Sequence, residues 1–342
     1  MKSTKMRFFF KIMLTLAAVI CSSIYLSACS GKKVTDEQKP TEIPTSGATA
    51  ATPGVNDTNA DNGGNISEGN EGTDSYDGYV GTVEIEPDSG EEFPLLVYDG
   101  LSYCIYSDHA EVIFTWFSDD TLEDYVIRSS VEYEGKSYPV TAIADDALNS
   151  FYEAVSITIP DSVTSIGNSA FEFCEKLETI VIPSSVTSIG DSAFSECSVL
   201  ASIVIPDSVT SIGKGIFFNC YELKSVTLPA GLTVIPEEAF SGCELLTDIT
   251  LPAGIASIER EAFWYCEALK TLELPEGLTI IGDSAFYDCI SLEELKLPKS
   301  LLMLSETALD SCDSLKRVYC PSSLMSNFAE LLDAYDVDVV EY

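Results

Sequence analysis

The C-terminal half of the chain repeats one pattern of apolar and polar positions every 23 residues. The clearest unit, residues 177–200, begins with the alternation Leu-x-x-Ile-x-Ile, which predicts a short strand with its apolar side chains on one side. A proline ends this strand, because proline has no N–H to donate to a ladder. A fixed period of this length predicts a solenoid, in which each unit buries its apolar face against its neighbours.

The second half of the unit predicts a turn and then a short helical segment. Val186 and Ile189 precede Gly190, a residue that suits a tight turn. Phe194 and Cys197 then follow with the spacing of one helical turn. We therefore expect an α/β repeat solenoid. Stacked units would bury one column of aromatic rings, made of Phe171, Phe194, Phe217, Phe240, Phe263 and Phe286.

The array starts earlier than its first proline. The apolar positions of residues 140–159 match those of residues 163–182, and the pattern continues to Cys320. Leu148 and Leu309 replace phenylalanine in the outermost units, and atypical end units are typical of caps. We expect leucine-rich-type repeats over residues 140–320, as seven full turns and part of an eighth.

A segment at each end of the array has the pattern expected of a cap. Residues 93–139 contain several short strand patterns and would cover the exposed edge of the first repeat as a β-rich N-terminal cap. Residues 321–342 predict a helix and then a final strand, which together form the expected C-terminal cap. The helical spacing is carried by Leu324, Phe328, Leu331, Leu332 and Tyr335.

The repeat I-x-I-P-x-x-V-x-x-I-G-x-x-A-F-x-x-C-x-x-L resembles the BspA-like, or Treponema pallidum-type, leucine-rich repeats of bacterial surface proteins. The match covers roughly half of the chain, about residues 140–321. The resemblance implies a curved, right-handed solenoid on a cell surface. Proteins with such repeats are associated with adhesion to host or matrix proteins, so the resemblance implies binding and names no ligand.

The N-terminus predicts export and lipid attachment. A basic start is followed by an apolar run to Leu26, and no acidic residue occurs before Asp36, as in a signal peptide. The sequence 26–29, Leu-Ser-Ala-Cys, resembles a bacterial lipobox, which implies removal of residues 1–28 and a diacylglycerol on Cys29. The alternatives are an ordinary signal peptide or an uncleaved anchor. We expect lipid anchoring at Cys29, with palmitate among its acyl chains, on the extracellular face of the bacterial cell membrane.

Residues 29–92 predict a disordered, lipid-anchored spacer. They are rich in Thr, Ser, Gly, Asp, Asn and Pro, and such a segment buries too little apolar surface to offset the entropy of ordering. A flexible chain of this length reaches roughly 40–45 Å. Residues 57–68 carry acidic and amide side chains at calcium-loop spacing, but Asn62 stands where that loop needs glycine, so we expect no metal.

The net charge of −37 excludes nucleic acid as a partner, because nucleic-acid binding needs a basic surface. Residues 1–28 carry four basic and no acidic residues, so their removal takes the net charge to −41. The simplest consequence of this charge is solubility at a crowded surface. Divalent cations or a basic patch on a partner are alternatives.

The cysteine pattern favours packing over bridges or metal. Nine cysteines follow Cys29, and seven of them keep the 23-residue period without the short Cys-x-x-Cys pairs of metal sites. A pairing of Cys104 with Cys320 stays open. The single histidine, His109, has no activating pattern around it, and nucleotide-binding motifs are absent from the sequence. We expect no catalysis and no cofactor.

The predicted strands expose side chains on the open side of the solenoid. The early strands carry small and hydroxylated residues there, and the late strands carry charges and an aromatic ring. Eight strands in one sheet would span roughly 35 Å. Arg and aromatic anchors are common at binding hot spots, whereas a plain solvated face is the alternative. The candidate partner-binding residues are Thr227, Asp248, Thr250, Glu273, Glu294, Lys296, Arg317 and Tyr319.

Three functions fit these features. The leading hypothesis is a monomeric, adhesin-like module that binds an extracellular protein or glycoprotein. The first alternative is a structural spacer or assembly protein of the cell envelope. The second alternative is a glycan-binding accessory, and the few aromatic residues on the predicted strand face count against it.

Overall fold

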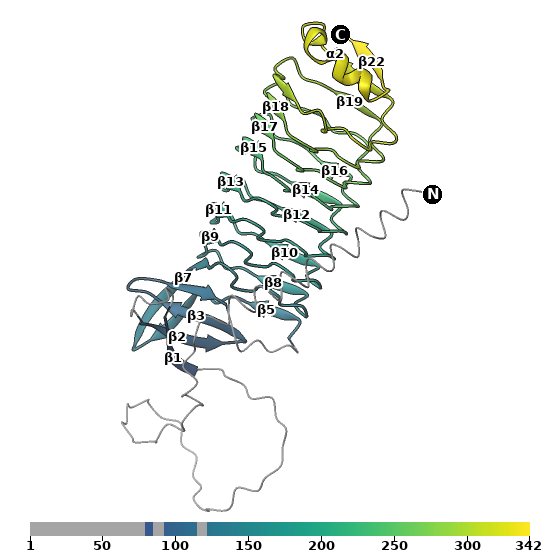
Figure 1. Ribbon diagram of the computed structural model, residues 1–342. Coiled ribbons are helices and arrows are strands. Elements are labelled where there is room, and N and C mark those ends of the chain that lie inside the picture. Colours follow the sequence, from purple (N-terminus) through teal and green to yellow (C-terminus); the bar gives the residue numbers. More distant parts are fainter. Residues whose placement is uncertain (1–78, 85–91, 115–121) are drawn as a thin grey trace, which may run out of the picture. The chain divides into compact units, whose positions relative to one another are not determined.

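Two columns of short parallel strands run through the repeats (Figure 1). This computed structural model describes residues 79–84, 92–114 and 122–342, all of which lie in one compact unit. The predicted signal peptide, Cys29 and most of the predicted spacer lie outside the described residues.

Within the repeats, the first strand column coincides with the predicted Leu-x-x-Ile-x-Ile strands, and one strand from each flanking segment extends it. Its strands pair in parallel, and Ile157 lies opposite Ile180, one repeat later. The column consists of β5 (Asp124–Val126), β8 (Ser156–Thr158), β10 (Thr179–Val181), β12 (Ser202–Val204), β14 (Ser225–Thr227), β16 (Asp248–Ile249), β19 (Glu294–Lys296), β21 (Arg317–Cys320) and β22 (Asp338–Glu341).

The prediction of one continuous sheet in this column is wrong. The column is divided into three sheets of three strands each, β5-β8-β10, β12-β14-β16 and β19-β21-β22. Residues 271–273, which should have formed the strand between β16 and β19, adopt no regular structure. The repeat before β19 therefore interrupts the open face.

The second strand column was not predicted. It consists mainly of two-residue strands ending at the isoleucine before the repeat glycine, and Ile189 pairs in parallel with Ile166 and Ile212. The strands are β7 (Lys136–Ile143), β9 (Ser165–Ile166), β11 (Ser188–Ile189), β13 (Ser211–Ile212), β15 (Val234–Ile235), β17 (Ser257–Ile258), β18 (Ile280–Ile281) and β20 (Met303–Leu304).

The predicted helical segment of each repeat is wrong: these residues form consecutive turns, so the repeats build a β-solenoid. Ser192 and Glu196 have φ of 54° and 60°, which a right-handed helix does not allow. The N–H groups of Ser192, Phe194 and Glu196 donate to carbonyl groups of the next repeat at 2.7–3.0 Å. Backbone groups that would have closed a helix are thus satisfied between repeats.

The core follows the predicted columns. The phenylalanine rings stack with centroids 5.2–5.8 Å apart and planes within 7–22° of parallel. All nine described cysteines are free, as packing requires. Each repeat cysteine donates its thiol hydrogen to a carbonyl group 26 residues earlier, as Cys197 does to Phe171 at 3.3 Å. Burial raises the pKa of the Cys174 thiol to about 12, so this thiol stays protonated and unreactive.

Antiparallel strands precede the repeats. The strands β1 (Tyr79–Glu84), β2 (Glu92–Tyr98), β3 (Leu101–Ile105) and β4 (Ala110–Ile113) pair in order, and β4 then pairs in parallel with β7. The strand β6 (Ser130–Tyr133) also pairs with β7. Since β1 lies inside the range assigned to the spacer, folded structure begins before residue 93.

A helix and a strand follow the repeats at the predicted positions. The helix α2 (Met325–Ala334) is the only α-helix among the described residues, and it buries Phe328 and Leu332. The strand β22 then pairs in parallel with β21 and lengthens the first strand column. That the segments at the two ends act as caps stays a prediction.

The repeat glycine allows close approach between repeats. A Cβ on Gly190 would lie 2.6 Å from the backbone nitrogen of Asn168 in the preceding repeat. The same atom on Gly282 would lie 2.9 Å from the nitrogen of Arg260. Neither glycine has a positive φ. The repeat therefore needs glycine here for its small size and not for the tight turn that the sequence predicted.

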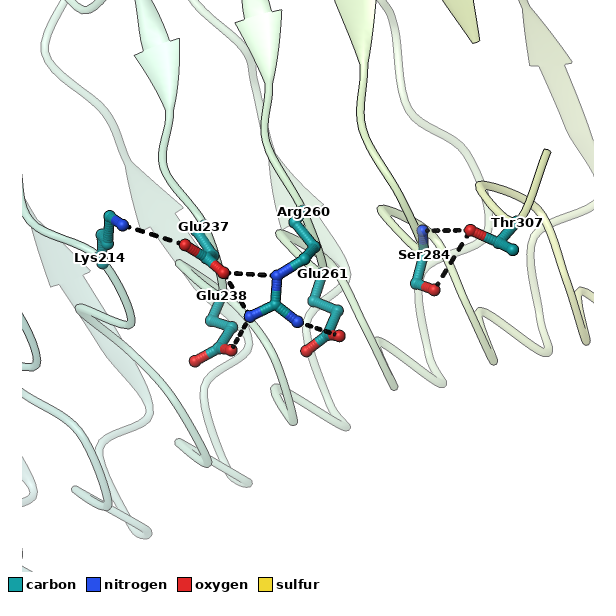
Figure 2. A network of polar contacts seen from close by, with 7 residues as sticks. All are labelled: Lys214, Glu237, Glu238, Arg260, Glu261, Ser284 and Thr307. Atoms are coloured by element: carbon teal, nitrogen blue, oxygen red, sulfur yellow. Dashed lines mark hydrogen bonds and ion pairs between the residues drawn. The ribbon is translucent and has the colours of Figure 1, made fainter. Parts of the chain in front are cut away.

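Side chains at the next position of the repeat also join neighbouring repeats. Asp145 Oδ1 accepts the backbone N–H of Asn168 at 2.6 Å, and Asn168 Oδ1 accepts that of Asp191 at 2.8 Å. Further along the array, ion pairs join neighbouring repeats at this position (Figure 2). The guanidinium of Arg260 contacts three carboxylates, those of Glu237, Glu238 and Glu261, and Lys214 Nζ lies 3.1 Å from Glu237.

We predict that Gly190→Ala destabilises the protein by about 1–3 kcal/mol, because the new methyl group overpacks the contact between two repeats. The matched control is Gly231→Ala, whose Cβ would have no neighbour within 4 Å. Urea unfolding of both variants measures the difference in free energy of unfolding. Equal stability of the two variants would contradict the steric role of Gly190.

We predict that Arg260→Met lowers the free energy of unfolding by about 0.5–1 kcal/mol at neutral pH and low salt, because its ion pairs are largely exposed. Hydrogen bonds from Lys214 and Arg260 lower the pKa of Glu237 below its ordinary value of 4.5. A lowered carboxylate pKa stabilises the fold above the unfolded pKa, and this contribution disappears as the pH falls through the folded value.

The effect of Arg260→Met should therefore shrink below pH 4.5 and in about 1 M salt. Lys270→Met is the control, because Lys270 is exposed and forms no ion pair within the described part of the chain. Denaturant titrations of the native protein and both variants at several pH values measure the effect. If Arg260→Met lowers the free energy of unfolding no more than Lys270→Met does, or by an amount independent of salt, the ion pairs of Arg260 do not stabilise the protein.

Candidate functional site

The structure places all eight candidate residues along the first strand column, in two groups. The first group, Thr227, Asp248 and Thr250, lies on or next to β14 and β16. These three side chains are exposed. Within the described residues they form no hydrogen bond or ion pair, so the structure adds no sign of a built site there.

The second group is Glu273, Glu294, Lys296, Arg317 and Tyr319, and side-chain contacts connect three of its members, Glu294, Arg317 and Tyr319. The parallel register of β19 and β21 sets Glu294 opposite Arg317 and Lys296 opposite Tyr319. Arg317 Nη1 donates to Glu294 Oε1 at 2.5 Å, and Tyr319 Oη donates to Glu294 Oε2 at 3.2 Å. One carboxylate thus holds both side chains of the neighbouring strand in place.

The second group, except for Arg317, borders a hollow with a volume of about 520 Å³. The hollow opens where residues 271–273 fail to form a strand. We call it the acidic hollow and define it by its lining residues, which are Thr271, Leu272, Glu273, Leu274, Glu276, Glu294, Lys296, Pro298, Tyr319 and Tyr342.

Sequence reasoning missed Tyr342, which forms part of the lining. Its hydroxyl donates to the carbonyl oxygen of Leu297 at 2.7 Å, and its ring lies 4.7 Å from Lys296 Nζ. The alternation of residues 337–342 predicted a strand, but it gave no sign of the strand's neighbour. The pairing of β22 with β21 brings Tyr342 to the hollow.

The charges of the acidic hollow balance once the neighbouring side chains are counted. Three carboxylates and one ammonium group line it, and the guanidinium of Arg317, paired with Glu294, and the ammonium of Lys299, 5.9 Å from the ring of Tyr342, lie beside it. The carboxylate of Glu276 accepts the backbone N–H of Lys299 at 3.3 Å. The exposed carboxylate of Glu273 has no partner within the described residues.

Aromatic side chains that the sequence analysis did not single out gather in the turns. The ring centroid of Trp264 lies 4.3 Å from that of Tyr265 and 6.3 Å from that of Tyr287. The previous repeat has Ser241 and Gly242 at the first two of these positions. The repeat therefore does not require aromatic residues there, and a search for departures from the pattern would have found them.

The surroundings of His109 hold no activated nucleophile. Its Nδ1 and Nε2 atoms contact Asp108 at 2.7 Å and Glu111 at 3.3 Å, and its ring stacks on Tyr106. Cys104, the nearby thiol, is fully buried, and burial raises its pKa to about 11.

Metal-ligand clusters and membrane-spanning helices are both absent from the part of the chain that the structure describes. The described residues contain no cluster of three or more His, Cys, Asp or Glu side chains that would hold a metal. Over the same residues, no helix has the length and apolar character needed to cross a bilayer.

Comparisons with known proteins agree with the repeat pattern. The family model described as the BspA type leucine-rich repeat region matches residues 141–270 and 233–331, in six copies. A leucine-rich repeat protein from Bacteroides ovatus is 26% identical, with a TM-score of 0.52 over 72% of this chain and 76% of its own. The leucine-rich repeat protein of T. pallidum is 30% identical, with a TM-score of 0.51 over 56% of this chain and 88% of its own.

No curated protein sequence matches the chain. The two ranges matched by the family model overlap, and together they extend from residue 141 to residue 331, more than half of the 342 residues. The chain belongs to the BspA-type leucine-rich repeat family.

Proposed function

We propose that the protein is a lipid-anchored module on the bacterial cell surface that binds an extracellular protein or glycoprotein through its first strand column. The binding role rests on the family and on the form of the array. Repeat proteins of this kind present an extended face built from many units, each held by its neighbours. The proposal includes no catalysis, because the array offers a surface rather than an activated group.

The observation that carries the proposal is the contrast between the early and the late strands. The early strands expose small side chains such as Ser202, whereas the late strands carry a connected set of charged and aromatic side chains beside the acidic hollow. The fold does not need this set, because other repeats stack without it. Partly buried Arg and Tyr side chains next to a cavity are the composition of binding hot spots.

Surface attachment is the second part of the proposal. It is supported by the lipobox-like residues 26–29 and by the polar composition of residues 29–92. Two lipid chains on Cys29 would give stable anchoring, since each buried CH₂ contributes about 0.8 kcal/mol. The spacer would then hold a monomeric repeat array away from the headgroups.

The test is a pull-down with the full chain, purified in mild detergent, against two sources. These are purified extracellular matrix and mucosal glycoproteins, and an envelope extract of the producing cells. The variant that tests the face combines Glu273→Lys with Lys296→Glu, which leaves the net charge unchanged. The matched control exchanges the exposed pair Glu222 and Lys224, whose charged atoms lie 3.9 Å apart.

We predict that a host glycoprotein binds the native protein and the control exchange, and binds the face variant about tenfold more weakly. Circular dichroism checks that both variants are folded. A partner that binds all three proteins equally would move the binding site away from the strand face. Capture only from the producer's own envelope would favour an assembly role, and failure to bind any partner would overturn the proposal.

A further inference from the structure

We propose that the repeat array bends at a joint between two of its repeats, and that an ion pair across the joint holds it closed. The joint lies between β13 (Ser211–Ile212) and β15 (Val234–Ile235). It concerns how the array moves and not what it binds, so it stands independently of the proposed function. Three features mark the joint: a break in the second strand column, a residue that causes the break and charges that bridge it.

The second strand column is broken once among the described repeats, at the joint. Its strands pair without interruption from β7 to β13 and from β15 to β20, but β13 and β15 do not pair. Next to the joint, the N–H of Ala256 donates to the carbonyl oxygen of Thr233, one repeat earlier, at 2.8 Å. The N–H of Thr233 makes no such bond to Thr210 within the described residues. The two repeats that meet at the joint are therefore not hydrogen-bonded along this column.

Pro236 explains the break. It occupies the position of the repeat glycine, and the N–H at this position donates to the preceding repeat elsewhere, as that of Gly190 does to Ile166 at 2.9 Å. Proline has no N–H, so this bond cannot form at the joint. A side chain alone does not prevent the bond, because Glu259 at the equivalent position donates its N–H to Ile235 at 3.0 Å.

Backbone hydrogen bonds remain on the other two sides of the joint. In the first strand column, β12 and β14 pair in parallel. In the turns, the N–H of Phe217 donates to the carbonyl oxygen of Ala239 at 3.0 Å. Two sides of the contact between these repeats are thus fastened, and the third is open. A contact of this kind bends like a hinge that opens along the second strand column.

An ion pair crosses the joint next to its open side (Figure 2). Lys214 closely follows β13 and Glu237 closely follows β15, and their charged atoms lie 3.1 Å apart. Arg260 contacts the same carboxylate from the next repeat and holds it in place. Hydrogen bonds from both cations lower the pKa of Glu237, so its carboxylate stays charged at neutral pH. Exposed ion pairs contribute little free energy, so this pair closes the joint without locking it.

The joint divides the array into two groups of repeats, each continuous in its own part of the second column. Bending changes the angle between these groups and with it the course of the first strand column. An extended face that bends at one place can follow partners of different curvature, whereas a rigid face fits a single shape.

Distances between two spin labels measure the bending. The labels are attached to unnatural ketone side chains at Thr164 and Leu302, so that the native cysteines are not modified. Both positions are exposed, adjoin the second strand column and lie six repeats apart across the joint. Six repeats span roughly 29 Å, a distance suited to double electron–electron resonance of the full chain in mild detergent.

We predict that Lys214→Met increases the population with longer distances about two- to fivefold, because it removes the ion pair that closes the joint. Adding Pro236→Ala to Lys214→Met should return the distances to those of the native protein, because alanine supplies the missing N–H for a backbone hydrogen bond. The control is Lys270→Met, which removes an exposed charge that forms no ion pair in the described part of the chain and should leave the distances unchanged.

Lys214 is exposed, so its substitution does not threaten the fold, and circular dichroism checks every variant. The same distances in the native protein, Lys214→Met and Lys270→Met would overturn the joint, because the array would then be rigid there. Longer distances in Lys214→Met that Pro236→Ala does not reverse would overturn it as well. Either result leaves the proposed function standing, because a rigid face can still bind a partner.

Discussion

Hydrogen bonds from the backbone of each turn to the next repeat are the interaction on which the rest of the structure depends. The turns of the described repeats contain residues with positive φ, such as Phe173 and Glu196, so their backbone groups cannot be satisfied within a helix. Donation to the neighbouring repeat solves this problem, and it also sets the spacing between repeats. The stacked phenylalanine rings and the thiol hydrogen bonds then fill the space that this spacing leaves.

The spacing also explains the most conspicuous small residues. Gly190 is needed because a methyl group would meet the backbone of the preceding repeat. Pro236 and Glu259 replace that glycine in two successive repeats, and the residues that follow them, Glu237 and Arg260, join the repeats by an ion pair instead of a side chain-to-backbone bond (Figure 2).

Much of this fold could be predicted from the sequence, because the period is expressed by residues that contact their own equivalents. The strand at Thr179–Val181, the column containing Phe194 and the packing of Cys197 all follow from the repeat. The second strand column was missed because a two-residue strand is too short to show alternation. The turns were mistaken for helix because the spacing of Phe194 and Cys197 suits both structures.

The candidate site was predictable only in part. Glu294, Lys296, Arg317 and Tyr319 share the strand face, and the parallel register brings them together as the sequence suggested. The acidic hollow was not predictable, because it depends on the missing strand at residues 271–273 and on Tyr342, which arrives through the pairing of β22. Departures from the repeat therefore indicate where a functional site is to be sought. The side chains that line such a site depend on contacts between residues distant in sequence.

Hydrogen–deuterium exchange of the full chain, followed by mass spectrometry of its peptides, tests the central claim most directly. If each turn donates its N–H groups to the next repeat, amides of the turn peptide 192–197 should exchange as slowly as those of the strands on either side. Exchange of these turn amides at the rate of open loops, with protection confined to the strands, would contradict the account.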